Sequence, residues 1–157
     1  MRKTMLFLAV LAFAGSLLAA DPLIGTWKLN LAKSKFAPNQ PDIPKSGTEV
    51  YREVEGGQIE LTYRRTEADG SSVLSKYTWP AQGGAAKTLQ GGPKQITTFI
   101  ETLIEPGNWY VTALQNGKQI SWAHKTISKD AKTMTVTWKN MDAHGKPILD
   151  IEVLDRQ

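Results

Sequence analysis

Aromatic side chains are the residues of this chain whose type most clearly indicates a function. The 157-residue sequence has five tryptophans and four tyrosines, all after residue 20: Trp27, Trp79, Trp109, Trp122, Trp138, Tyr51, Tyr63, Tyr77 and Tyr110. Each tryptophan offers a large apolar ring with one hydrogen-bond donor, which suits a pocket that holds a small apolar molecule. The competing interpretation is that these rings only fill a core.

Alternation along the chain selects the candidate cavity residues. Tyr63, Trp122 and Trp138 each follow an aliphatic residue at a spacing of two, so each shares an apolar face of an expected strand with that residue. His124 shares the face of Trp122, where an imidazole could hydrogen-bond the polar end of a ligand or titrate near neutral pH. We therefore expect Tyr63, Trp122, His124 and Trp138 to line a cavity. A structural histidine and packed tryptophans are the alternative.

The sequence contains no recognised catalytic or metal-binding pattern. It has no cysteine, which excludes thiol catalysis and thiolate metal sites. His124 and His144 are far apart, and there is no Gly-x-Ser-x-Gly or Walker motif. We expect no catalytic residue, no metal and no cofactor. An enzyme is the third hypothesis, and it would need a cluster of polar groups with perturbed titration. Nothing in the sequence selects such a cluster. The carboxylates that could form one are Glu49, Glu53, Glu101 and Asp150.

The elements that must position these residues are short strands separated by turns. Residues 24–31, 58–66 and 133–139 alternate apolar and polar side chains, the pattern of half-buried strands. Asp69-Gly70 and Asn116-Gly117 are pairs typical of hairpin turns. No stretch shows sustained 3.6-residue periodicity, so we predict an all-β chain. Further strands are expected at residues 48–54, 73–79, 95–104, 109–114, 118–127 and 148–154, with at most one short strand in 80–95.

Consecutive strands linked by tight turns form an antiparallel up-and-down meander. A meander of about eight to ten strands usually closes into a β-barrel, because closure removes unpaired strand edges. A barrel of about eight strands holds either packed side chains or one small ligand. A β-sandwich is the competing architecture, but it needs longer connections between sheets, and only residues 33–47 and 80–95 are long enough.

The first 20 residues predict export. Arg2 and Lys3 precede an apolar run over residues 5–14, and Ala19-Ala20 precede the polar Asp21. This is the order of a cleavable signal peptide, and the run is shorter than the roughly 20 residues of a membrane-spanning helix. We expect cleavage near Ala20, a periplasmic or extracellular location, and one domain over residues 21–157 without a stable membrane span. An uncleaved anchor is the alternative.

The charge of the chain argues against nucleic-acid binding. The chain has 19 Lys and Arg and 15 Asp and Glu; the predicted signal peptide contains two of the basic residues and no acidic one, so 17 and 15 remain. Arg64 and Arg65 are adjacent, but Glu60 and Glu67 flank them. A nucleic-acid-binding domain concentrates its basic residues in one patch or stripe. We therefore expect no nucleic-acid partner.

Residues 24–30, Ile-Gly-Thr-Trp-Lys-Leu-Asn, resemble the Gly-x-Trp signature of lipocalins and other calycins. The longer pattern, which adds residues 34–36, 69–70 and 128–135, is similar to a group of secreted bacterial lipocalin-like proteins and covers most of the chain after residue 20. The resemblance implies a lipocalin-like β-barrel, in which Gly25 lets the chain turn into the barrel and Trp27 closes one end.

The resemblance also implies a basic residue from a late strand packed on the Trp27 ring, for which Lys125 and Lys139 are both possible. It supplies no catalytic residue. The chain departs from classical lipocalins because it has no disulfide and no expected C-terminal helix.

These observations together favour a secreted or periplasmic protein that binds a small hydrophobic or amphipathic ligand inside its barrel. The alternative is a protein-binding module, such as a secreted inhibitor or an envelope interaction domain, that uses residues 33–47 and 80–95 at the barrel mouth. The sequence identifies neither the ligand nor the oligomeric state.

Overall fold

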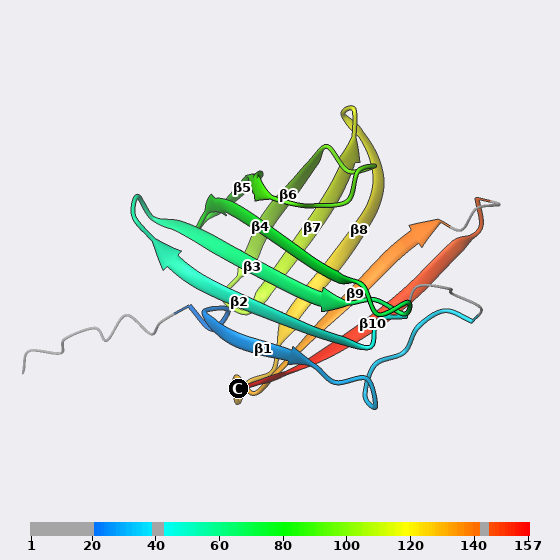
Figure 1. Ribbon diagram of the computed structural model, residues 1–157. Helices are drawn as coiled ribbons and strands as arrows, with labels where there is room; N and C mark the ends of the chain where they lie inside the picture. The colour runs from blue at the N-terminus through cyan, green and yellow to red at the C-terminus, as the bar shows by residue number, and fades with distance from the viewer. Residues whose placement is uncertain (1–20, 39–42, 142–144) are drawn as a thin grey trace, which may run out of the picture.

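The computed structural model describes residues 21–38, 43–141 and 145–157. The predicted signal peptide and His144 lie outside these residues. The described residues form ten strands (Figure 1): β1 (Gly25–Leu29), β2 (Ser46–Val54), β3 (Gln58–Thr66), β4 (Ser72–Pro80), β5 (Gly83–Gln90), β6 (Thr98–Glu105), β7 (Asn108–Gln115), β8 (Lys118–Ile127), β9 (Thr133–Met141) and β10 (Pro147–Arg156). None of the described residues belongs to a helix long and apolar enough to cross a membrane.

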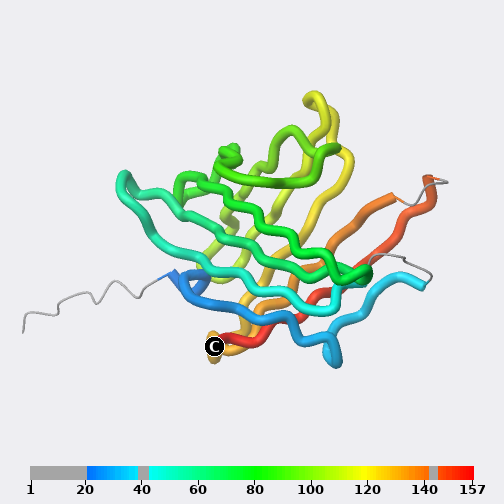
Figure 2. Tube along the Cα trace, in the orientation of Figure 1, coloured from blue at the N-terminus to red at the C-terminus, as the bar shows by residue number. Residues whose placement is uncertain are grey.

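The strands close into one antiparallel barrel. Each strand pairs with its neighbours in sequence, and β1 pairs with β10 to complete the ring. Figure 2 shows the chain passing up and down around the barrel and ending beside β1. This arrangement confirms the predicted all-β, up-and-down, lipocalin-like barrel. It also excludes the sandwich, because the residues of the Gly-rich segment contribute β5 to the same ring.

The hairpin turns form where the sequence predicts them, because their residues accept positive φ angles. Asn116 and Gly117 have φ angles of 50° and 80° between β7 and β8, as a type I′ hairpin requires. Between β3 and β4, Gly70 has a φ of 90°, and the N–H of Ser71 donates a 2.8 Å hydrogen bond to Asp69 Oδ1. Such local preferences fix where each strand ends.

Trp27 closes one end of the barrel, as the resemblance implies. Its ring is fully buried, and its Nε1 donates a 2.9 Å hydrogen bond to the carbonyl of Leu23. The basic residue on the ring is Arg156, whose Cζ lies 4.2 Å from the ring centroid. The expectation of Lys125 or Lys139 is therefore wrong. Lys139 is exposed near the opposite end of β9, whereas Arg156 lies directly opposite Trp27 in the β1–β10 pair.

Arg156 also explains why the signature needs glycine at position 25. Its guanidinium donates hydrogen bonds to the carbonyls of Pro22, Ile24 and Ala131. Gly25 has a φ of 141°, and a Cβ there would lie 2.6 Å from Arg156 Nη1. Because three carbonyls hold the guanidinium, it has little room to move away.

The inner face of the barrel has two halves that differ in burial. The half next to Trp27, here called the closed half, consists of fully buried side chains: Tyr51, Ile59, Trp79, Trp109, Met134 and Leu154. Toward the other end, the inward-facing side chains of Tyr63, Arg65, Phe99 and Trp138 are only partly buried, and that of Val73 is exposed. We call this end the open half, because solvent reaches the inner face there.

Candidate ligand-binding site

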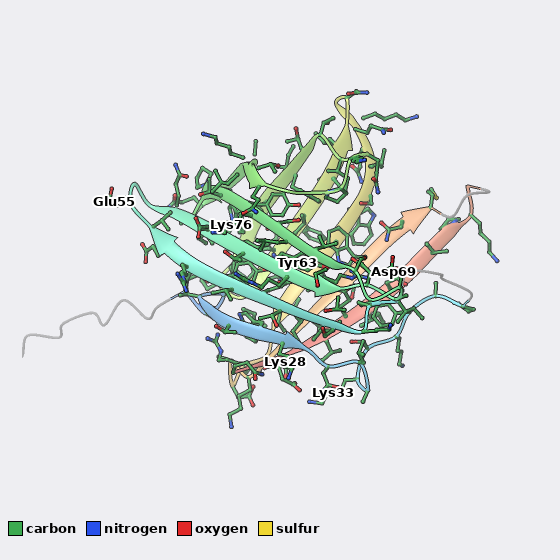
Figure 3. All side chains as sticks on the ribbon, viewed as in Figure 1. Lys28, Lys33, Glu55, Tyr63, Asp69 and Lys76 are labelled. Atoms are coloured by element: carbon green, nitrogen blue, oxygen red, sulfur yellow. The ribbon has the colours of Figure 1, made fainter. Side chains whose placement is uncertain are left out.

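Tyr63 and Trp138 lie on the inner face, as the sequence analysis expects. Tyr63 lies between Leu61 and Arg65 on the inward-facing side of β3, and Trp138 packs against the core from β9. Figure 3 shows Tyr63 in the middle of the molecule, whereas Glu55 and Asp69 lie at the opposite ends of β3. The placement brings two of the four candidate cavity residues to the open half; their binding of a ligand remains a prediction.

Trp122 and His124 lie on the outer face, which corrects the expectation that they point into the barrel. The inward-facing side of β8 includes the buried Ala123 and Lys125. On the outside, the Tyr110 and His124 rings stack with centroids 4.6 Å apart, and Tyr110 contacts Trp122 edge-on at 6.0 Å. Tyr110 is 41% exposed. His124 Nε2 lies 2.7 Å from Asn108 Oδ1, so its polar partner is also on the outer side of the sheet.

A buried lysine lies on the inner face of β8. The Nζ atom of Lys125 lies 3.6 Å from Glu101 Oε2, and both residues are about 95% buried, with exposed fractions of 4% and 5%. The same ammonium lies 5.0 Å from the ring centroid of Tyr51 and 5.9 Å from that of Trp79. Carboxylate and aromatic rings together stabilise a cation that has lost its water.

A second cation, Arg65, lies at the open half within a group of acidic side chains. Its Nη1 donates a 3.0 Å hydrogen bond to Tyr63 Oη and lies 3.6 Å from Glu152 Oε1. Its Nε lies 3.2 Å from Glu67 Oε2. Arg65 also lies at a depression of about 340 Å³ where β2, β3 and β4 meet, which is lined by residues 46–48, 64–66 and 72–74.

Two further carboxylates face the interior from β2 and β10. Tyr51 Oη donates a 2.5 Å hydrogen bond to Glu49 Oε2, and the N–H of Ala37 donates a 2.8 Å hydrogen bond to Asp150 Oδ1. The second bond ties the connection between β1 and β2 to the open end of β10. Glu49 lies opposite Tyr63 in the β2–β3 pair, and its hydrogen bond connects it to Tyr51, the ring beside the Lys125 ammonium.

Burial perturbs the titration of these groups. Burial raises the pKa of Glu152 to about 7, because it outweighs the attraction of Arg65, and Glu49 and Asp150 add repulsion. Burial also raises the pKa of Glu101, which the nearby Lys125 lowers only in part. Burial and the Glu49 carboxylate raise the pKa of Tyr51 well above its usual range, and burial raises that of Tyr63. Both phenols are therefore neutral at neutral pH; Tyr51 donates to Glu49, and Tyr63 accepts from Arg65.

One buried polar atom on the inner face, Trp109 Nε1, has no hydrogen-bond partner among the described residues, and its side chain is 1% exposed. Glu101 Oε2 is also buried, and its partner is the Lys125 ammonium, at the ion-pair distance of 3.6 Å. Trp109 lies opposite Lys125 in the β7–β8 pair, so both atoms lie in the same region of the interior. Buried polar atoms without a partner are rare and costly, so each calls for a physical explanation.

The sequence analysis named part of this cluster and missed the rest. Three of the four carboxylates that it considered, Glu49, Glu101 and Asp150, face the interior; Glu53 is exposed. It missed Arg65 and Glu152 as inner residues, and it considered Lys125 only as a possible partner of Trp27. The sequence does carry a signal for Arg65: it lies two residues after Tyr63 and therefore on the same face of the strand. The general rule that charged side chains face water leads away from this conclusion.

Comparison with known proteins shows the fold and no more. No protein-family model matches the chain, and no curated protein matches it. Among solved structures, it is similar to an asparagine-to-alanine mutant of the fluorescent protein UnaG, with a TM-score of 0.59 and 13% identity over 87% of this chain and 96% of that chain. Wild-type UnaG gives a TM-score of 0.58 and 14% identity over 87% of this chain and 98% of that chain. Shared folds host unrelated functions, so the function is argued from the site.

Proposed function

We propose that this protein binds a small amphipathic molecule in the open half of its barrel. The supporting observation is that Tyr63, Phe99 and Trp138 face inward yet are partly accessible, beside a buried group of charged side chains. A site with apolar and aromatic walls and a few fixed polar groups is the usual form of a small-molecule pocket. The fully buried closed half supports the proposal, because it gives the ligand a rigid floor.

Displacement of a neutral apolar dye, N-phenyl-1-naphthylamine, tests the proposal. Trp138→Ala removes an aromatic wall of the site, and we expect it to weaken dye binding at least about tenfold, as the loss of a central tryptophan contact commonly does. Trp122→Ala is the matched control, because it removes a partly buried tryptophan from the outer face. If Trp122→Ala weakens binding and Trp138→Ala does not, the site is not inside the barrel. Trp138→Phe serves where the alanine variant does not fold.

A protein-binding role is the second proposal. The observation that favours it is the stack of Tyr110, His124 and Trp122 on the outer face, because exposed aromatic groups often mark interfaces. This stack lies on β7 and β8 and not in residues 33–47 or 80–95. Two results together would favour this role. The wild type should bind no dye, and it should capture a protein partner that Trp122→Ala does not capture.

We also propose that the protein works in the periplasm or outside the cell. The support is the sequence of residues 1–20, with its basic start, apolar run and small residues before Asp21. N-terminal sequencing of the protein from fractionated host cells tests this. A mature chain that begins near Asp21 in the exported fraction is expected, and an intact Met1 in the cytoplasmic fraction would contradict it.

A further inference from the structure

We infer that the ligand of this barrel carries a cationic group, such as a protonated amine, at the end that enters the interior. The inference rests on the proposed function and adds the chemical class of the ligand. Its basis is the charges of the inner face, their partners, and one buried hydrogen-bond donor that lacks an acceptor.

The buried acidic side chains of the interior outnumber its cations. Glu49, Glu101, Asp150 and Glu152 face it; Lys125 pairs with Glu101, and Arg65 contacts Glu152, whose pKa of about 7 leaves it only partly charged at neutral pH. Asp150 is engaged by the N–H of Ala37, so Glu49 is the carboxylate whose charge these cations do not compensate. Buried charges are costly unless opposite charges or protons compensate them. An anionic ligand would add to the excess, and a cationic ligand would reduce it. A metal ion is not the compensating charge suggested here, because no three of the described acidic and histidine side chains are placed to hold one.

The cations of the interior are already engaged by protein groups. Lys125 pairs with Glu101, and Arg65 contacts Glu67, Glu152 and the Tyr63 hydroxyl. A carboxylate or phosphate on the ligand would have to displace one of these carboxylates to gain a cation, and would leave that carboxylate buried without its partner. A buried carboxylate left without its cation is strongly destabilising, so this exchange of partners is unfavourable.

Glu49 is the carboxylate best placed to receive a cationic group. It is 8% exposed, it accepts a hydrogen bond from Tyr51, and no cation of the described residues lies within ion-pair distance of it. It also lies opposite Tyr63, so it faces the partly accessible open half. A ligand ammonium beside Glu49 would have a carboxylate on one side and an aromatic ring on another.

The interior already contains an ammonium in such surroundings. The Lys125 ammonium lies near the faces of Tyr51 and Trp79 and beside Glu101, so these walls accept a cation once a carboxylate is close. Trp109 Nε1 is a buried donor without an acceptor among the described residues. A hydroxyl or carbonyl oxygen beside the amine of the ligand would offer that acceptor.

Competition between three molecules with the same twelve-carbon chain tests the inference. Dodecylamine, 1-dodecanol and dodecanoate each compete with N-phenyl-1-naphthylamine at pH 7, below their aggregation limits. We expect dodecylamine to bind at least about tenfold more tightly than dodecanol, and dodecanoate to bind most weakly. The overall charge of the chain is positive, so general attraction would favour dodecanoate and cannot produce this order.

Glu49→Gln tests whether the preference for the amine depends on the Glu49 carboxylate. The amide keeps the shape and an acceptor for Tyr51 but removes the charge, so the preference for the amine over the alcohol should fall at least about fivefold. Glu55→Gln is the matched control on the exposed turn after β2, and it should leave the preference unchanged.

Each outcome separates the inference from the proposed function. Displacement of the dye with dodecanoate as the tightest competitor, or with equal affinities for the three head groups, overturns the inference and keeps small-molecule binding. An amine preference that Glu49→Gln does not reduce overturns the assignment to Glu49. If the protein binds neither the dye nor any of the three molecules, both the proposed function and the inference fail.

Discussion

Replacing Glu152 with glutamine should change how the stability of the protein depends on pH. Burial raises the pKa of Glu152 to about 7 from its usual value of 4.5, and the Arg65 guanidinium 3.6 Å away does not offset this rise. A pKa difference of this size corresponds to about 3 kcal/mol between the two protonation states. Glutamine keeps the shape of the side chain and an acceptor for Arg65, but it cannot ionise.

The sign of the effect follows from which state holds the proton. Between the unfolded pKa of 4.5 and the folded pKa of about 7, the folded protein keeps the Glu152 proton and the unfolded chain releases it. The free energy of unfolding contributed by this group therefore falls as the pH rises through this window and is constant above it. Relative to Glu152→Gln, the wild type should lose about 3 kcal/mol between pH 4.5 and pH 8.

Urea unfolding followed by tryptophan fluorescence measures this difference at several pH values. Glu101, whose pKa is also raised, and Asp69, Asp130 and Asp155, whose pKa values are lowered, titrate in both proteins and cancel in the comparison. Glu55→Gln, on an exposed turn, should run parallel to the wild type. A difference between wild type and Glu152→Gln that stays constant from pH 4.5 to pH 8, or that grows in favour of the wild type, would refute the account of this side chain.

Two further substitutions test the closed end and the buried ion pair. Gly25→Ala should lower the free energy of unfolding by about 2 kcal/mol or more, because its Cβ would meet Arg156 Nη1 and its φ of 141° strains any side chain. Urea unfolding measures this free energy. A change below about 0.5 kcal/mol would contradict the packing argument. Lys125→Met should cost about 3 kcal/mol at neutral pH, because it leaves the Glu101 carboxylate buried alone. The double variant Lys125→Met/Glu101→Gln should recover most of that loss in the same assay, and a double variant as unstable as Lys125→Met would show that the pairing does not matter.

Much of the fold is predictable from the sequence because its determinants are local. The Asn116-Gly117 and Asp69-Gly70 pairs select hairpin turns, and alternation marks the strands between them. Once each strand reverses beside the one before it, ring closure follows from the need to pair the last edges. The pairing of Trp27 with Arg156 joins the two ends of the chain, so only the structure reveals that Arg156 is the basic partner.

The orientation of β8 is not predictable from its own residues. Both of its faces carry large side chains: Trp122 and His124 on one, and Lys125 and Ile127 on the other. The general rule that apolar rings face inward and lysine faces water selects the wrong face. What reverses the rule is Glu101, which lies on β6 and compensates the charge of Lys125 across the barrel interior. A partner on a strand two places away in the ring leaves no signal in the sequence of β8 itself.

The same physical reason hides the polar part of the candidate site. Arg65 and Glu152 lie on β3 and β10 and meet only because the barrel closes. Tyr63 and Trp138 are recognisable because an aromatic ring on an alternating strand is informative by itself. The apolar walls of a barrel site are therefore easier to predict than its charges, whose value depends on partners far away in the chain.

Native mass spectrometry of the protein purified from its own host tests the central claim most directly. We expect one small organic molecule per chain, lost from the spectrum after organic extraction and present at lower occupancy in Trp138→Ala than in Trp122→Ala. A protein that carries no molecule, and whose tryptophan fluorescence does not respond to a panel of fatty amines, fatty acids, fatty alcohols and isoprenoids, would contradict small-molecule binding in the barrel.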